Sequence, residues 1–358
     1  MDIEELRMFT LKLSRTRGVG SLTFKKLLAE FGGMSNLYED FCPNSGHGLL
    51  QKIKLSNDEK IFKELTHLNV GYKCVWEDDF PFRLKQMDDP PIVIYYKGDW
   101  NETIINNSIS VVGTRKFTSY GSTMTNKLVS DLVTTGYTII SGMALGIDRL
   151  AHEAALGNNG KTIAILAADV SNPSPYANSD IYYRILDNGG LIISEFAHDI
   201  PIQAGMFVQR NRIVAGISLG TLIIEAGIDS GALTTADLAF NYNRDVFAVP
   251  GNVGHLQSAG CNKLIKENKA KLVENLNDIM LEYGHLNNSV FSNRGDIIGG
   301  LNGEERAVYD VLLPESRLVE EISEILNKHI SEISKTCTLL ELKGILKKDE
   351  TGKYFISI

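Results

Sequence analysis

The sequence predicts an α/β protein built on a doubly wound, mostly parallel sheet, with a small helical domain before it and a three-helix module after it. Between residues 105 and 285, short apolar runs alternate with amphipathic stretches, which indicates strands alternating with helices. The runs are apolar throughout, as is typical of parallel strands that helices cover on both faces. The predicted sheet is therefore of the extended Rossmann-like type.

The first 70 residues are predicted to form the small helical domain, of a SAM-like or helix-hairpin-helix-like kind. Ile3–Leu13 carries apolar residues at helical spacing, and a second such stretch, Leu22–Phe31, follows a Gly-Val-Gly turn at residues 18–20. From there the pattern changes to two short β-rich runs, Val70–Val75 and Ile92–Tyr96, separated by prolines. We therefore expect the sheet domain to occupy residues 71–285.

The central strands and helices follow one another in a regular order. Helices are expected at Tyr120–Thr134, Ile147–Leu156 and Thr234–Asn241. Ligands on parallel sheets bind at the carboxyl ends of the strands, so the segments after them are the places to look for a site. The predicted strands are Ile109–Val112, Tyr137–Ile140, Thr162–Leu166, Leu191–Ile193, Gly220–Ile224 and Val246–Val249.

The end of the chain has a different pattern. Residues 286–300 are rich in Asn, Gly and Ser and are predicted to be a linker. Helical patterns follow at Glu304–Leu313, Leu318–Asn327 and Ile330–Leu342, and residues 347–356 predict a β-hairpin around Gly352. Three helices and a hairpin predict a winged-helix-like module at residues 301–358. Its mixed charge favours a protein-interaction role over a duplex-DNA regulator.

Composition and charge limit the class of function. A chain of 358 residues, 43% hydrophobic and 22% charged, is long enough for two or three ordinary folded domains. An acidic, amphipathic start and the absence of a long apolar run predict a cytoplasmic protein with no membrane segment. The four scattered cysteines and unclustered histidines predict no metal site. A net charge of −8 argues against indiscriminate DNA coating, but screening leaves room for a small basic groove.

Three predicted strand ends carry small-residue loops that open a helix: Val112–Gly121, Ser141–Asp148, and Leu219–Gly227 running on to Ser230–Ala232. Glycine allows close backbone approach, and N–H groups at a helix start attract anions. Arg115 adds a side chain suited to bidentate phosphate contact. Tight turns alone would also use glycine, but three such loops on one sheet favour a phosphate site. No dinucleotide fingerprint or Walker A loop is present, so no cofactor is expected.

A fourth segment, FVQRNRIVAG, begins at Phe207 and places Arg210 and Arg212 on either side of an asparagine. Guanidinium groups pair with phosphates and a base stacks on an aromatic face, so the segment suits a strand of nucleic acid. The alternative is that the phenylalanine belongs to the core and that the arginines pair with acids such as Glu195 and Glu225.

Glu225 also supports a rival function from another class. Hydrolases of the Rossmann-like lysine-decarboxylase-like family cleave the N-glycosidic bond of nucleoside monophosphates and carry a PGGxGTxxE loop. The segment Ser218–Glu225 has the Gly-Thr pair but lacks Pro-Gly-Gly. Asp148, the other candidate acid, opens a helix, where a carboxylate is favourable without any catalytic role. We therefore predict a binding protein with no catalytic residues.

Taken together, the motifs resemble DNA-processing protein A, the DprA/Smf family. Its members carry GSRxxTxYG-like, SGxAxGID and FPxRNRIIAG-like segments, then LGxLxxEAxxxSGxLxTA and VPG followed by Gly-x-Asn-x-Leu-Ile. This sequence has all five in order over roughly half the chain, from Gly113 to Ile265. Thr114, Met143 and Val208 depart from the pattern, where serine, leucine and proline are usual.

The resemblance implies a protein that binds single-stranded DNA and helps to load the recombinase RecA onto it, as in natural transformation and homologous recombination. It also implies a homodimer formed through the Rossmann-like domain. Carried over by motif position, the expected DNA-binding residues are Gly113, Thr114, Arg115, Ser141, Gly142, Met143, Ala144, Gly146, Phe207, Arg210, Asn211, Arg212, Ser230, Gly231 and Lys263.

Overall fold

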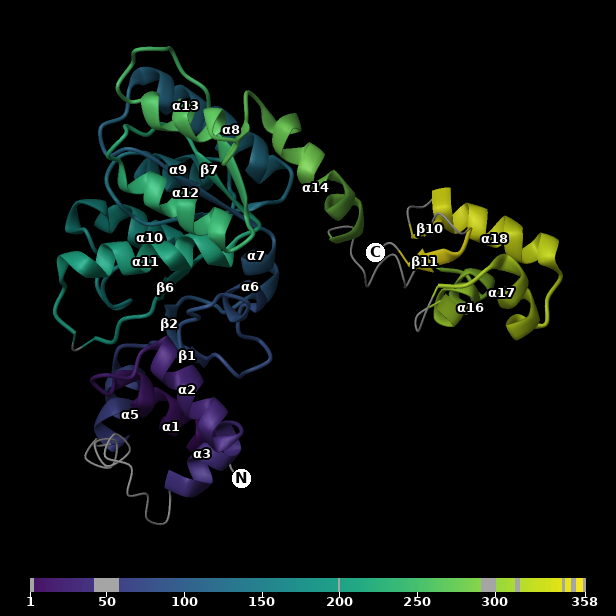
Figure 1. Cartoon of the computed structure of the whole chain (residues 1–358), viewed down its shortest axis with the longest axis horizontal. Helices are drawn as coiled ribbons and strands as arrows, with labels where there is room; N and C mark the ends of the chain where they lie inside the picture. Colours follow the sequence, from purple (N-terminus) through teal and green to yellow (C-terminus); the bar gives the residue numbers. More distant parts are fainter. Residues whose placement is uncertain are drawn as a thin grey trace. The chain divides into compact units, whose positions relative to one another are not determined.

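The structure is a computed structural model that describes residues 3–41, 58–198, 200–290, 301–312, 316–342, 345–348 and 352–356 (Figure 1). The chain forms two compact units, residues 1–276 and 277–358. Of the predicted linker, residues 286–290 belong to helix α14 (Leu276–Val290), and the remaining residues lie outside the described part. Among the described residues, no helix is long and apolar enough to cross a membrane, and no cluster of metal-ligating side chains is found.

The N-terminal helices confirm the predicted helical domain. Their apolar faces meet in a core that includes Phe9, Leu11 and Phe24, and this core continues onto Val93 and Tyr95 of the sheet. In Figure 1 these helices lie beside the first two strands. The small domain is therefore packed on the sheet within one unit. The helices are α1 (Ile3–Arg15), α2 (Ser21–Phe31), α3 (Met34–Phe41) and α5 (Asp58–His67).

A nine-stranded sheet of mostly parallel strands confirms the predicted fold class. Its order is β1-β2-β6-β5-β4-β3-β7-β8-β9; the run from β6 to β9 is parallel, and the β1–β2 hairpin joins β6 antiparallel. The strands are β1 (Gly71–Cys74), β2 (Val93–Lys97), β3 (Ser108–Val112), β4 (Thr138–Ser141), β5 (Thr162–Ile165), β6 (Leu191–Ser194), β7 (Gly220–Ile223), β8 (Asp245–Ala248) and β9 (Lys271–Leu272).

Apolar side chains alternate between the two faces of the sheet, which explains the continuous apolar runs. Ile163 and Ile165 of β5 join one core, and Ala164 between them joins the other. Helices cover both faces, because each crossover between parallel strands returns over one of them. They are α6 (Phe82–Lys85), α7 (Glu102–Asn106), α8 (Ser119–Thr134), α9 (Ile147–Gly157), α10 (Ser179–Asp187), α11 (Ala204–Ile217), α12 (Gly231–Asn241) and α13 (Ala259–Lys266).

The strand order reverses between β3 and β7. From β3 the chain proceeds through β4, β5 and β6 toward one edge, and from β7 through β8 and β9 toward the other. Loops that leave two neighbouring strands in opposite directions open a crevice at their carboxyl ends. The fold therefore places a crevice between the loops that follow β3 and β7.

The second unit contains α16 (Gly303–Leu312), α17 (Val319–Leu326) and α18 (Ile330–Leu342), followed by the antiparallel pair β10 (Leu346–Lys348) and β11 (Tyr354–Ile356). An isolated bridge joins Arg317 to Tyr354, so a third short segment lies against the hairpin. This order of helices and strands agrees with the pattern expected from the sequence. The winged-helix-like assignment itself stays a prediction, as do the predicted domain boundaries.

Candidate functional site

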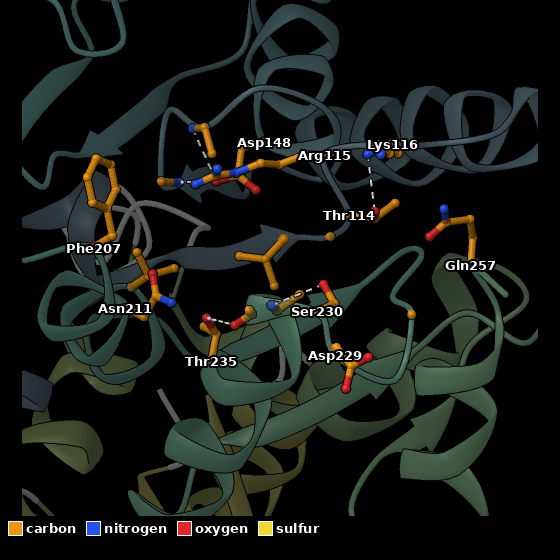
Figure 2. A pocket seen from close by; sticks show the side chains of 18 of the residues that line it. Thr114, Arg115, Lys116, Asp148, Phe207, Asn211, Asp229, Ser230, Thr235 and Gln257 are labelled. Carbon is orange, nitrogen blue, oxygen red and sulfur yellow. Dashed lines mark hydrogen bonds between the residues drawn. The ribbon is translucent and has the colours of Figure 1, made fainter. Parts of the chain in front are cut away.

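A pocket of about 850 Å³ lies at the carboxyl ends of β3, β4 and β7, where the strand order reverses (Figure 2). Its size lies in the range of small-molecule and cofactor sites, and it is open enough to take part of a longer chain. The lining residues come from the glycine-containing loops after these strands, from α11, from the beginnings of α12 and α13, and from the loop between β8 and α13. The three glycine-rich loops identified in the sequence therefore do meet at one place.

Two cations stand on one side of the pocket. Arg115 and Lys116 follow β3 directly, and both side chains are exposed. The Lys116 N–H donates to Thr114 Oγ1 at 3.1 Å, which holds this turn in shape. Figure 2 shows these residues facing Asp229 and Ser230 across the pocket. The pocket thus has one positively charged wall.

Asp148 fixes the loop that follows β4. Its Oδ2 accepts hydrogen bonds from Gly142 N at 3.2 Å and Ala144 N at 3.4 Å. These two N–H groups belong to one of the three loops expected to hold a phosphate, and an internal carboxylate already occupies them. Asp148 is buried, and its burial raises the pKa of the carboxyl group, against the opposing effect of the Arg210 charge.

Arg210 lies beneath the same loop. Only 5% of the residue is exposed, and Nη1 donates to the carbonyl oxygens of Gly142 and Ile165. Its Nε donates to Asn211 Oδ1 at 3.2 Å. Burial lowers the pKa of the guanidinium group, and the neighbouring Asp148 opposes this shift. Arg210 therefore ties the ends of β4 and β5 to α11 and presents little of its charge to the pocket.

Arg212 has the ion-pair environment that the sequence left open as an alternative. The residue is 7% exposed, and its Nη2 donates to Glu195 Oε1. Its Nη1 donates to the Asp89 carbonyl oxygen at 2.6 Å. It does not line the pocket. In this structure it joins α11 to the segment before β2.

Glu225 does not line the pocket. Its carboxylate accepts from Thr118 N at 2.8 Å and from Thr118 Oγ1 at 2.6 Å, and the residue is 2% exposed. A Cβ at Gly121 would lie 2.1 Å from Glu225 Oε2, so a larger residue at the start of α8 would displace this carboxylate. The carboxylate supports the loop after β3 and is not placed to act on a ligand in the pocket.

The remaining predicted residues divide clearly. Ser141 and Met143 are fully buried, with Ser141 Oγ donating to Val111 O at 2.6 Å. Lys263 is exposed on α13, away from the pocket lining, and 3.9 Å from Glu267. Gly146 also lies outside the lining. The predicted residues that do line the pocket are Gly113, Thr114, Arg115, Gly142, Ala144, Phe207, Arg210, Asn211, Ser230 and Gly231.

Several pocket residues were missed from the sequence. Lys116 stands beside Arg115, and a second cation in the same loop was a usable signal. The others carry no cationic side chain, and they come from several segments that only the fold brings together at the pocket. They are Val112, Asp148, Val208, Val214, Gly227, Ile228, Asp229, Ala232, Thr235, Leu256, Gln257 and Ala259.

The fold and the pocket define a doubly wound α/β protein with a candidate ligand site at the switch point of its sheet. Residues 72–284, more than half of the chain, match the family described as DNA recombination-mediator protein A. Residues 4–65 match the DprA-like N-terminal HHH domain. The chain belongs to this family, which confirms the resemblance seen in its motifs.

Individual relatives agree with this assignment. Protein Smf of Synechocystis sp. is 33% identical over 289 residues, covering 77% of this chain and 72% of that protein. The X-ray structure of DNA processing protein A from Streptococcus pneumoniae has a TM-score of 0.67 and 29% identity, covering 77% of this chain and 97% of that chain. A structure describing the single-stranded DNA binding mode of DNA processing protein A from Helicobacter pylori has a TM-score of 0.54 and 28% identity, covering 61% and 96%.

Proposed function

We propose that this protein binds single-stranded DNA in the pocket at the β3–β7 switch point. One observation carries the proposal: Arg115 and Lys116 are exposed on the wall of a pocket that lies at the carboxyl ends of the strands. Cationic side chains on an open groove suit a phosphate backbone. The match to the Helicobacter pylori protein, whose structure concerns single-stranded DNA, points to the same ligand class.

Within the pocket, the residues act in two ways. Arg115 and Lys116 hold phosphates, and Phe207, which is partly buried at the pocket edge, offers its ring to a base. Arg210 and Asp148 are positioning residues, because both are buried and both bind the Gly142 backbone. Arg212 and Met143 stabilise the structure around the site and do not contact the strand. Lys263 stays a predicted contact outside the pocket.

Fluorescence anisotropy with a labelled oligonucleotide tests the proposal. Arg115→Ala is expected to weaken binding roughly tenfold, the effect of losing one charge-assisted hydrogen bond. Arg184→Ala is the matched control, because Arg184 is an exposed arginine on α10 outside the pocket lining. Equal affinities of the wild type and Arg115→Ala would rule out the pocket as the binding site. An unlabelled duplex should compete less well than a single strand.

The biological role that we propose is the loading of RecA onto single-stranded DNA, by a cytoplasmic homodimer of this chain. Membership of a recombination-mediator family supports this role. The test is whether the protein speeds RecA filament formation on single strands coated with a single-strand-binding protein. Light scattering across a concentration series measures the oligomeric state. A protein that binds DNA but leaves the filament rate unchanged would contradict the loading role alone.

A further inference from the structure

The two walls of the pocket differ chemically. The wall after β3 carries Arg115 and Lys116. The opposite wall is lined by residues 227–230 of the loop after β7 and by Leu256 and Gln257 of the loop after β8, and none of these is a lysine or arginine. The two segments touch, since a Cβ at Gly227 would lie 3.4 Å from the Leu256 carbonyl oxygen. Figure 2 shows Asp229, from the first segment, across the pocket from Arg115.

Aliphatic side chains are exposed on this second wall. Ile228 is 51% exposed and Leu256 is 82% exposed, and both line the pocket. Exposed apolar area is unfavourable in water, and apolar groups gathered at a pocket often mark a binding surface. Here the two aliphatic side chains line the same cavity as the two cations.

The loop that carries Leu256 is held firmly at its base. Tyr120 Oη donates to the Pro250 carbonyl oxygen at 2.7 Å. The Asn262 side chain donates to Gly251 O at 2.9 Å and accepts from Gly251 N at 3.2 Å. These contacts present the leucine on a fixed support, which lowers the entropy lost when a ligand packs against it.

We propose that the bases of the bound strand lie against Ile228 and Leu256 while its phosphates face Arg115 and Lys116. The inference rests on the proposed function and adds the orientation of the strand to it. An unstacked base has an apolar face and no net charge, so it suits the aliphatic wall. A phosphate suits the opposite wall, because the Asp229 carboxylate on the aliphatic side repels it. The two walls are parts of one cavity, so a single strand can contact both.

The test compares two labelled oligonucleotides of equal length, one with natural bases and one abasic, by anisotropy with the full chain. The wild type should bind the natural strand more tightly. Leu256→Ser should weaken binding of the natural strand roughly fivefold and leave the abasic strand unaffected. Ile228→Ser should act in the same direction. Arg115→Ala should weaken both strands by the same factor.

Val253→Ser is the matched control. Val253 lies in the same loop and is 98% exposed, but it does not line the pocket, so this substitution should change neither affinity. If Leu256→Ser weakens binding of both strands, or of neither strand, the proposed base contact is wrong. A change of oligomeric state in Leu256→Ser without a base-dependent effect would assign the surface to a second copy and also overturn it. If the wild type binds neither strand, the proposed function itself fails.

Discussion

At the scale of single residues, the site depends on two buried charges, Asp148 and Arg210, which hold the loop after β4. Asp148 is 6% exposed and binds two backbone N–H groups of the glycine loop, while Arg210 binds the carbonyl oxygen of the same loop. A buried charge that loses its partner is strongly destabilising, because its hydration is not recovered. The pair therefore couples the shape of the pocket to the stability of the fold.

The first prediction concerns this pair. Asp148→Asn should lower the free energy of unfolding by roughly 3 kcal/mol, because the Arg210 charge stays buried without a counter-charge. Urea denaturation followed by circular dichroism measures the change. Asp180→Asn is the control, since Asp180 pairs with Arg149 on the surface and such pairs contribute less than about 1 kcal/mol. Losses of similar size in both variants would contradict the coupling.

The second prediction concerns His152, which is fully buried. Thr162 Oγ1 donates to Ile139 O, so the imidazole Nδ1–H donates to Thr162 Oγ1 at 2.7 Å. Burial lowers the pKa of His152 to about 3. Near pH 6.5 the unfolded chain takes up a proton at this imidazole, whereas the folded protein does not. The free energy of unfolding therefore falls as pH drops from about 6.5 toward 3.

Urea unfolding at several pH values tests this. Between pH 6.5 and 5, the wild type should lose roughly 1–2 kcal/mol more than His152→Leu, whose side chain does not titrate. Between pH 7 and 8, where the imidazole is neutral in both the folded and the unfolded state, the two stability curves should run parallel. Curves that stay parallel down to pH 5 would show that His152 does not carry the acid sensitivity.

At the scale of elements, the strands before the pocket were predictable, whereas helix α11 beside it was not. Each parallel strand is a short apolar run buried on both faces, so β3 to β8 are recognisable to within about one residue at each end. Helix α11 has no polar face to reveal it, because Arg210 and Arg212 to Ile217 are all buried. Its arginines therefore looked like surface cations. Whether a cation reaches the pocket depends on burial, which sequence spacing does not encode.

The third prediction compares two glycines, one directly before α9 and one at its end. Gly146 precedes the helix with φ +92°, and a Cβ there would lie 2.4 Å from the Thr114 carbonyl oxygen. Gly146→Ala should therefore cost at least about 1–2 kcal/mol and, by displacing Arg115, weaken single-stranded DNA binding. Gly157 is the last residue of the helix, where a Cβ meets nothing within 4 Å. Gly157→Ala should raise stability by up to about 1 kcal/mol and leave binding unchanged.

Thermal unfolding and anisotropy on the same preparations separate the two effects of this pair. An unchanged melting temperature in Gly146→Ala would mean that the loops after β3 and β4 are not in the close contact described.

At the scale of the whole molecule, an acidic chain uses a small cationic site. The net charge is −8, yet Arg115 and Lys116 stand together on one wall of the pocket. Charges farther away than about 8–10 Å are screened at moderate salt, so the acidic surface does not prevent a local contact with phosphates. It does oppose non-specific wrapping of DNA around the protein. The number of phosphates neutralised should therefore be small.

The last prediction follows from the small number of phosphates that the protein neutralises. For single strands, the slope of log affinity against log salt concentration is about −0.7 for each phosphate neutralised. Two facing cations predict a slope of about −1.4, which is roughly a sevenfold loss between 50 and 200 mM salt. Lys116→Ala should reduce the slope by about 0.7, whereas Arg184→Ala, outside the pocket lining, should not change it. Anisotropy titrations at four salt concentrations give these slopes. A wild-type slope near −3 or steeper would mean that cations beyond the pocket also hold the strand.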